Sequence, residues 1–350
     1  MMKREPSGTR INTAQLASVA LAFVAGIIAT SFLPVKQGRQ FIDGFATNAA
    51  TPESAAVGHA AQLHSGATPI DLTPRQRECL ARGEKFKADL LSAQPRQMHH
   101  PFDEPFVSPI TTARDPVFFD YASRTPTDKV TAHAYHNLYS RYLPHARLHD
   151  LNILEVGLGC NMFYGPGASL NLWRALLPCA NISFVEYDAE CANKYKSQVE
   201  MQGEGRLYIG SQDDPKLLAE IVADAKAAGG FDMIVDDGSH SHKHIWATLN
   251  ALWPTLKPGG VYVIEDLIYH WFFPTWSNYT IATPATSAVP LFQRLIHTMN
   301  CLTTNRFSED YKAWCRKEQD DSIFKDVINI DCMPDACALV KGRPLAGLRD

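Results

Sequence analysis

Acidic side chains follow two apolar, strand-like segments in the second half of the chain. One segment ends in Asp236 and Asp237, with His240 three residues further on, and the other ends in Glu265 and Asp266. Because the carboxyl ends of neighbouring parallel strands meet at one edge of a sheet, we expect Asp237, Glu265 and Asp266 to converge. Carboxylates so close together repel one another unless a cation neutralises them, and oxygen ligands favour Mg²⁺, Ca²⁺ or Mn²⁺. The pattern predicts a divalent-metal site, with Mg²⁺ as the expected ion.

The run Asp-Asp-Gly-Ser-His places His240 one turn beyond Asp237. A metal that binds an acceptor hydroxyl makes that hydroxyl more acidic and orients it, and a histidine beside it can take up the released proton near neutral pH. His240 is therefore the predicted general base. Aspartates at strand ends, Asp-Gly turns and single histidines are also common structural features. The hypothesis depends on the whole group and not on one member.

A glycine-rich turn follows an earlier apolar segment, in the run Glu155-Val-Gly157-Leu-Gly159. Glycines at such a place let the backbone turn sharply and approach a ligand closely, although a purely structural turn would look the same. The run lacks the third glycine of the dinucleotide-binding fingerprint, which weighs against a nicotinamide-dependent dehydrogenase.

Glu186 ends the next strand-like segment, 31 residues after Glu155. This spacing fits one strand–helix–strand unit, and an acid at that place can accept hydrogen bonds from both hydroxyls of a ribose. Asp188 lies past the apolar run and is expected to cap the following helix.

From about residue 127 onward, strand-like and helix-like segments alternate, which predicts an α/β fold with a doubly wound, mostly parallel sheet. The first helix is expected at 128–143. Seven strands are expected, the last two forming an antiparallel hairpin, at 152–156, 182–186, 206–209, 232–236, 260–265, 327–330 and 337–340.

The glycine turn, Glu186 and the run Leu256-Lys-Pro-Gly-Gly260 resemble, in this order, the motifs of class I S-adenosylmethionine-dependent methyltransferases. The resemblance covers about residues 127–342 and implies that the glycines face the methionine part of the cofactor while the acid holds its ribose. Residues after the third strand contact adenine in that family. The cofactor-binding residues expected for S-adenosylmethionine are Glu155, Gly157, Gly159, Glu186, Gln212, Asp213 and Asp236.

The acidic block also resembles one subgroup, the metal-dependent sugar O-methyltransferases of macrolide biosynthesis of the macrocin and mycinamicin type. The resemblance implies that Asp237, Glu265 and Asp266 hold Mg²⁺ and that His240 is the base. The acceptor would then be a hydroxyl of a sugar or glycan. Two alternatives stay open, namely a phenolic or other small natural product as acceptor, and a catalytically inactive methyltransferase-like binding protein.

Two further stretches carry the resemblance. The run Thr127-Asp-Lys129 with Tyr135 and Tyr139 is similar to the segment that the macrolide enzymes carry ahead of their first strand. The run from Gly157 to Gly167 is similar to uncharacterised fungal relatives.

The N-terminal part of the chain predicts a membrane anchor and a stem. Residues 14–35 carry no charge, and twenty residues at about 1.5 Å each give roughly 30 Å, enough to cross a bilayer core. We expect a cytoplasmic tail at 1–13, a stem with a helix near 75–93 at 36–100, and a luminal methyltransferase domain at 101–345, in the Golgi or endoplasmic reticulum. The alternative is a cleaved signal peptide and a secreted protein.

Composition narrows the choice of partners and compartment. A formal net charge of −4 gives no indication of a nucleic-acid partner. The eight cysteines form no CxxC pair, so a structural zinc site is not expected. In an oxidising lumen Cys332 could pair with Cys337, or Cys301 with Cys315, whereas in a reducing compartment they would be small buried hydrophobic residues.

Overall fold

The structure of the protein is a computed structural model, which describes residues 72–95, 116–143, 146–267, 292–293, 295–296, 299–300, 308–320 and 325–342. All of these belong to one compact unit, Asp71–Asp350. The predicted tail, membrane anchor and most of the stem lie outside the described residues. Within the described part of the chain, no helix is long and apolar enough to cross a membrane.

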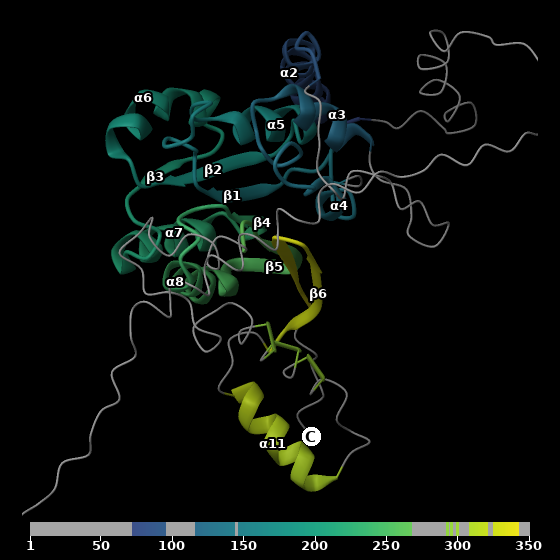
Figure 1. The fold of residues 1–350 in the computed structure, drawn as a ribbon, viewed down its shortest axis with the longest axis vertical. Helices are drawn as coiled ribbons and strands as arrows, with labels where there is room; N and C mark the ends of the chain where they lie inside the picture. The colour runs from purple at the N-terminus through teal and green to yellow at the C-terminus, as the bar shows by residue number, and fades with distance from the viewer. Residues whose placement is uncertain are drawn as a thin grey trace, which may run out of the picture. The chain divides into compact units, whose positions relative to one another are not determined.

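A seven-stranded mixed sheet forms the centre of the unit, as predicted (Figure 1). Its strands follow the order β3-β2-β1-β4-β5-β7-β6. Strands β1 to β5 are parallel to one another, and β7 runs antiparallel to both of its neighbours, β5 and β6. Their bounds are β1 Asn152–Val156, β2 Asn181–Glu186, β3 Leu207–Ile209, β4 Phe231–Asp236, β5 Leu256–Ile264, β6 Val327–Met333 and β7 Ala336–Lys341.

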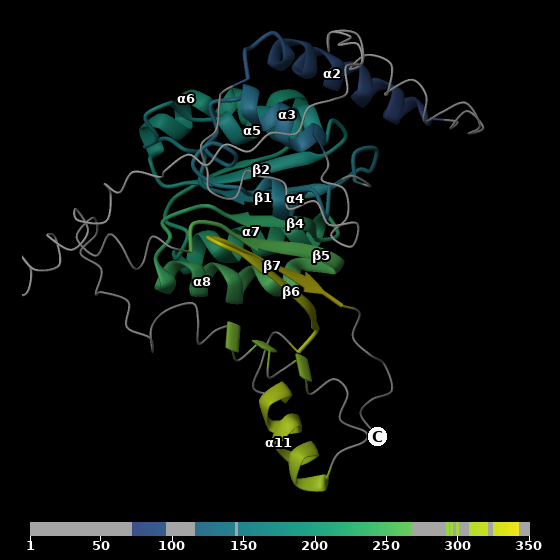
Figure 2. The same ribbon diagram turned by 45° about the vertical axis from the view of Figure 1, so that its right-hand side comes forward.

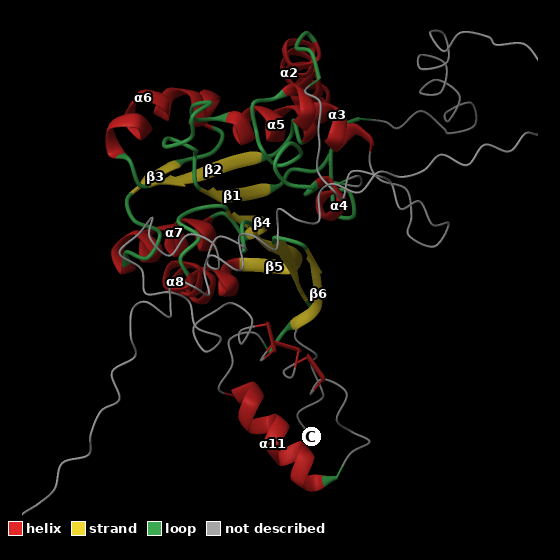
Figure 3. Ribbon diagram, in the orientation of Figure 1, coloured by secondary structure: helices red, strands yellow, loops and turns green. Residues whose placement is uncertain are grey.

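Helices cover both faces of this sheet (Figures 2 and 3). The α-helices are α2 Pro74–Leu91, α3 Pro116–Arg124, α4 His136–Tyr139, α5 Ala168–Leu176, α6 Ala189–Val199, α7 Pro215–Ala227, α8 His242–Leu252 and α11 Glu309–Asp320. Helices α2, α3, α5 and α6 lie on one face, and α7 and α8 lie on the other.

The strand residues divide between two hydrophobic clusters, one on each face. Ile153 belongs to the cluster that contains Trp173 of α5, and its neighbour Leu154 belongs to the cluster that contains Leu249 of α8. This alternation follows from the extended backbone, in which successive side chains point to opposite faces. Two residues that follow each other at a strand end therefore face different sides of the sheet.

The predicted helix at 128–143 is wrong. Residues 128–135 form turns, in which the amides of Thr131, Ala132 and His133 all donate to the carbonyl of Asp128, and only the short helix α4 follows. The β-branched residues in this segment disfavour a helix. Lys129 and Tyr135 are six positions apart, which is about 1.7 turns of a helix. A continuous helix would therefore point their side chains in different directions. In the structure both are buried.

Three disulfide bonds cross-link the described part of the chain. Cys79 of α2 pairs with Cys179, Cys160 pairs with Cys191, and Cys332 pairs with Cys337. The last of these is one of the two pairings predicted for an oxidising lumen. Cys315 is also disulfide-bonded, and none of the described cysteines is free. The helix predicted near 75–93 is α2, and the first bond fastens it to the segment between α5 and β2.

Among the three described disulfides, we expect the Cys79–Cys179 bond to contribute most to stability, because it closes a loop between residues 100 positions apart. Loop-closure entropy gives about 5 kcal/mol for a loop of this length and about 2 kcal/mol for the short Cys332–Cys337 loop. Replacing both cysteines of the long pair by alanine should therefore lower the free energy of unfolding, measured in denaturant, by more than the same change in the short pair. Equal losses would contradict this ranking.

Candidate functional site

Three acidic side chains share one face of the sheet at the carboxyl ends of its central strands. Glu155 lies in β1, Asp237 follows β4, and Glu265 follows β5. The residue two positions before each of them belongs to the core cluster on the α5 side, so strand alternation brings the three acids to that side. Asp236 pairs with Ile264 in the β4–β5 register, which sets Asp237 and Glu265 level with each other.

Lys129 extends its ammonium group into the middle of these acids. Its Nζ lies 2.9 Å from Oδ2 of Asp237 and 3.3 Å from Oε1 of Glu155, and it donates a hydrogen bond to Glu265. The lysine is 1% exposed. Glu265 also accepts a hydrogen bond from the hydroxyl of Tyr139, and Glu155 accepts one from the indole of Trp173.

Lys129 and the acids around it shift one another's pKa values. Burial alone would lower the pKa of Lys129, but Asp237, Glu265 and Glu155 outweigh it and raise that pKa well above the ordinary value for lysine. Burial opposes ionisation of Asp237, but Lys129 and His240 outweigh it and hold the pKa of Asp237 below its ordinary value. Burial raises the pKa of Glu155 and of Glu265. The stable arrangement is a charged lysine beside an ionised Asp237.

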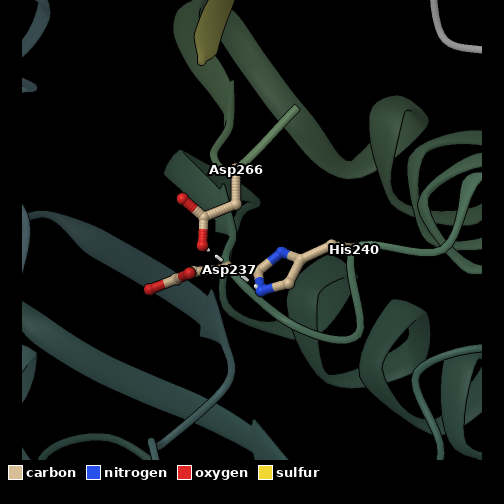
Figure 4. A group of neighbouring side chains, drawn as sticks. All are labelled: Asp237, His240 and Asp266. Carbon is tan, nitrogen blue, oxygen red and sulfur yellow. Dashed lines mark ion pairs between the residues drawn. The ribbon is translucent and has the colours of Figure 1, made fainter. Parts of the chain in front are cut away.

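A second group, which we call the outer group, consists of Asp237, His240 and Asp266 (Figure 4). One potential ligand atom from each residue lies within 4.8 Å of the other two, and Nε2 of His240 is 3.4 Å from Oδ2 of Asp266. The hydroxyl of Tyr135 donates to Oδ1 of Asp266 at 2.6 Å and accepts from the backbone amide of the same residue. Asp237 thus belongs both to the lysine cluster and to the outer group.

His240 and Asp266 both have left-handed backbone conformations, with φ of 55° and 56°. Side chains other than glycine rarely adopt such angles, and strained residues of this kind gather at functional sites. The departure from strand geometry turns Asp266 toward His240, although Asp266 directly follows Glu265 along the chain.

The outer group fits a divalent cation. Its two carboxylates, from Asp237 and Asp266, supply the oxygen ligands that Mg²⁺ and Mn²⁺ prefer. Two of the predicted metal ligands, Asp237 and Asp266, come together here with the predicted base, His240. The third predicted ligand, Glu265, lies beside them, and its carboxylate accepts hydrogen bonds from Lys129 and Tyr139.

The predicted glycine turn touches the acidic edge. Gly157 has φ of 103°, and a Cβ at this position would lie 2.1 Å from the carbonyl oxygen of Asp237. No other residue type fits there. Gly159 also has a left-handed conformation, with φ of 82°. The predicted ligand loop and the predicted metal site are therefore next to each other.

Glu186 lies against the same loop. Its carboxylate accepts hydrogen bonds from the amides of Leu158, at 3.1 Å, and Asp188, at 2.9 Å. Asp188 caps α6 through the amides of Glu190 and Cys191, as predicted. The Cys160–Cys191 bond ties the loop to the first turn of that helix, so the surroundings of Glu186 are covalently fixed.

The remaining predicted cofactor residues make protein contacts. Asp236 is 1% exposed and faces the α8 side, where it accepts from the amide of Gln212 and the hydroxyl of Tyr262. Gln212 also bonds Thr248 and the amide of Ser239. These contacts brace the turn after β4. Asp213 accepts from the hydroxyl of Ser211 and pairs with Lys243 and His244.

Lys129 is a residue of this site that the sequence patterns do not predict, although it belongs to the segment that resembles the macrolide enzymes. The patterns also do not predict His133, which lies between Asp266 and Asp335 with 3.2 Å contacts to each and stacks on Tyr135. Strand alternation could have shown that three acids on one face need a cationic partner. No local pattern shows that this partner comes from residue 129.

Parts of this chain are similar in sequence to known proteins. Residues 166–267 match the family described as a methyltransferase domain. Demethylmacrocin O-methyltransferase of Streptomyces fradiae is 33% identical over 159 residues, which cover 45% of this chain and 38% of that protein. L-olivosyl-oleandolide 3-O-methyltransferase of Streptomyces antibioticus is 33% identical over 172 residues, covering 48% and 41%. The chain thus spans about two fifths of the curated relatives that it matches.

A solved structure is also similar. The MycE methyltransferase of the mycinamycin biosynthetic pathway, in complex with Mg and SAH, superimposes with a TM-score of 0.52 at 25% sequence identity. The similarity covers 68% of this chain and 58% of that one.

We expect Asp236 to make stability depend on pH. Burial raises the pKa of Asp236 to about 6, from about 4 in an unfolded chain. The folded state then binds this proton more tightly, so the stabilisation is complete below about pH 4 and is lost as the pH rises through about 6, by about 3 kcal/mol. The free energy of unfolding of Asp236→Asn, measured across this pH range, should not show the decrease that the wild-type protein shows. A wild-type curve parallel to that of the variant would contradict the assignment.

Proposed function

We propose that this chain, which carries a class I S-adenosylmethionine-dependent methyltransferase domain, transfers a methyl group from that cofactor to a hydroxyl group with the help of a divalent metal. The observation that carries the proposal is the outer group of Asp237, His240 and Asp266, held directly beside the turn at Gly157. A donor site and a site for activating a hydroxyl would then be adjacent.

The donor site is formed by the glycine turn and Glu186. Glu186 accepts hydrogen bonds from three backbone amides, those of Leu158, Asp188 and, at 3.5 Å, Cys160. A carboxylate has about four acceptor positions, so Glu186 keeps one position for a ribose hydroxyl. Gly157 and Gly159 leave room for the methionine part because they carry no side chain. When bound, S-adenosylmethionine supplies an electrophilic methyl group on sulfur.

The outer group would hold and deprotonate the acceptor. A divalent cation bound by Asp237 and Asp266 would make a coordinated hydroxyl more acidic. His240 is placed to accept the hydroxyl proton as the oxygen forms its bond to the methyl carbon and the carbon–sulfur bond breaks. Tyr135 fixes the carboxylate of Asp266, and Lys129 fixes that of Asp237.

A sugar hydroxyl is the proposed acceptor class. The relatives named above include an enzyme of an olivosyl macrolide, and the similar structure belongs to a macrolide pathway. A phenolic acceptor would use the same metal chemistry. Assaying transfer from labelled S-adenosylmethionine to a panel of glycosides and phenols, with and without chelator, separates the two classes.

Variants of the outer group test the mechanism. Asp237→Asn should lower metal-dependent turnover by at least 100-fold, because it removes a charged ligand, while S-adenosylhomocysteine binding measured by calorimetry changes little. His240→Ala should lower kcat by about 10²–10⁴-fold, the usual contribution of a general base.

The control is Asp150→Asn, at an exposed ion pair with Arg75, which should leave turnover unchanged. Full activity in both outer-group variants would exclude the mechanism. Failure of the wild-type protein to bind S-adenosylhomocysteine would favour a catalytically inactive domain.

We also propose that the chain is a single-pass membrane protein with its catalytic domain in the lumen of the secretory pathway. The charge-free run at 14–35 supports an anchor, and the described disulfides support an oxidising compartment. In sealed microsomes the domain should resist protease and should react with a thiol-specific polyethylene glycol reagent only after reduction. Protease-sensitive protein with reactive thiols would contradict this placement, whereas secretion into the medium would indicate a cleaved signal.

A further inference from the structure

Lys129 is the most deeply buried cation at the acidic edge, and the mechanism above uses it only to fix Asp237. Its side chain is 1% exposed, and the side chains of its partners Glu155 and Glu265 are 0% and 1% exposed. A lysine is rarely buried this completely unless acids surround it. The three acids come from the ends of three neighbouring strands, so one ammonium joins β1, β4 and β5.

The charges explain why such a lysine is needed. Acidic groups a few ångströms apart and away from water repel strongly, because the interior screens charge poorly. An ammonium group has three donors and no acceptor. Lys129 donates hydrogen bonds to Asp237 and Glu265 and forms an ion pair with Glu155. Without this cation the same acids would have to take up protons, move apart or recruit a cation from solution.

We propose that Lys129 is a positioning residue whose ammonium serves as the resident counter-cation of the site, holding Asp237 and Glu265 side by side so that the outer group keeps its spacing whether or not a divalent ion is bound. This inference rests on the proposed metal-assisted function. Asp237 is the link, because its Oδ2 is bound to Lys129 while the same carboxylate contributes an atom to the outer group.

A direct consequence is that Lys129 limits how strongly the site needs an external cation. Methionine has a similar length but no charge, so Lys129→Met leaves the acids without their partner. Mg²⁺ should then replace part of the missing charge. The fold of the variant should become more dependent on Mg²⁺ than the wild-type fold.

The test measures metal dependence without measuring turnover. The melting temperature of full-length wild-type protein and of Lys129→Met is recorded in chelator and in Mg²⁺, and Mn²⁺ affinity is measured by electron paramagnetic resonance. We expect Lys129→Met to melt lower than wild type in chelator and to gain at least twice as many degrees from Mg²⁺. Its Mn²⁺ dissociation constant should be at least tenfold lower, because a repelling charge beside Asp237 is gone.

Two further variants separate this role from a merely structural one. Lys257→Met removes an ion pair with Asp232, of 2.7 Å, at the other end of β4, and should lower the melting temperature without changing the Mg²⁺ response. The double variant Lys129→Met with Glu155→Gln removes one negative charge together with the positive one. It should return the Mg²⁺ response to near the wild-type value.

An unchanged Mg²⁺ response in Lys129→Met overturns the inference. Lys129→Met could fail to fold in chelator. In that case the inference is supported if Mg²⁺ restores folding or if the double variant folds, and it is overturned if neither happens. Wild-type protein that binds neither Mn²⁺ nor S-adenosylhomocysteine overturns the proposed function instead. Wild-type protein that binds both, with Lys129→Met behaving identically, overturns only the role of Lys129.

Discussion

Acidic groups from neighbouring strands can share one sheet edge only if positive charge lies among them, and this electrostatic constraint organises the site. The parallel sheet places Glu155, Asp237 and Glu265 on the same face, and Lys129 supplies the cation from a segment that precedes the sheet. The turns at 128–135 follow from this requirement, because they bring the lysine and Tyr135 to the same edge.

The donor side and the acceptor side of the site are mechanically connected. The amide of Asp237 donates to the carbonyl of Val156 at 3.0 Å, and a side chain at Gly157 would collide with the carbonyl of Asp237, so the loop that would hold the cofactor lies against the turn that would hold the metal. The Cys160–Cys191 bond then fixes the same loop to α6, near Glu186. This arrangement suits the proposed methyl transfer, which depends on the alignment of donor and acceptor.

Local sequence patterns were sufficient to predict the sheet, the glycine turn and the meeting of Asp237 with Asp266, because each depends on strand periodicity and on the geometry of parallel strand ends. They were not sufficient for Lys129, whose partner Asp237 lies 108 residues away, or for the irregular segment around it. The inward direction of Asp236 could have been predicted, since it alternates with Asp237. The contacts of Gln212 could not have been predicted, because they depend on how α8 packs against the sheet.

Metal binding at the acidic edge can be observed in crystals of the protein grown with Mn²⁺ and S-adenosylhomocysteine, by anomalous diffraction at the manganese edge. Metal-assisted activation requires one strong peak within coordination distance of the carboxylates of Asp237 and Asp266. The ammonium of Lys129 should remain beside Glu155. A crystal that contains bound S-adenosylhomocysteine but shows no peak at these carboxylates would contradict metal-assisted activation of the acceptor.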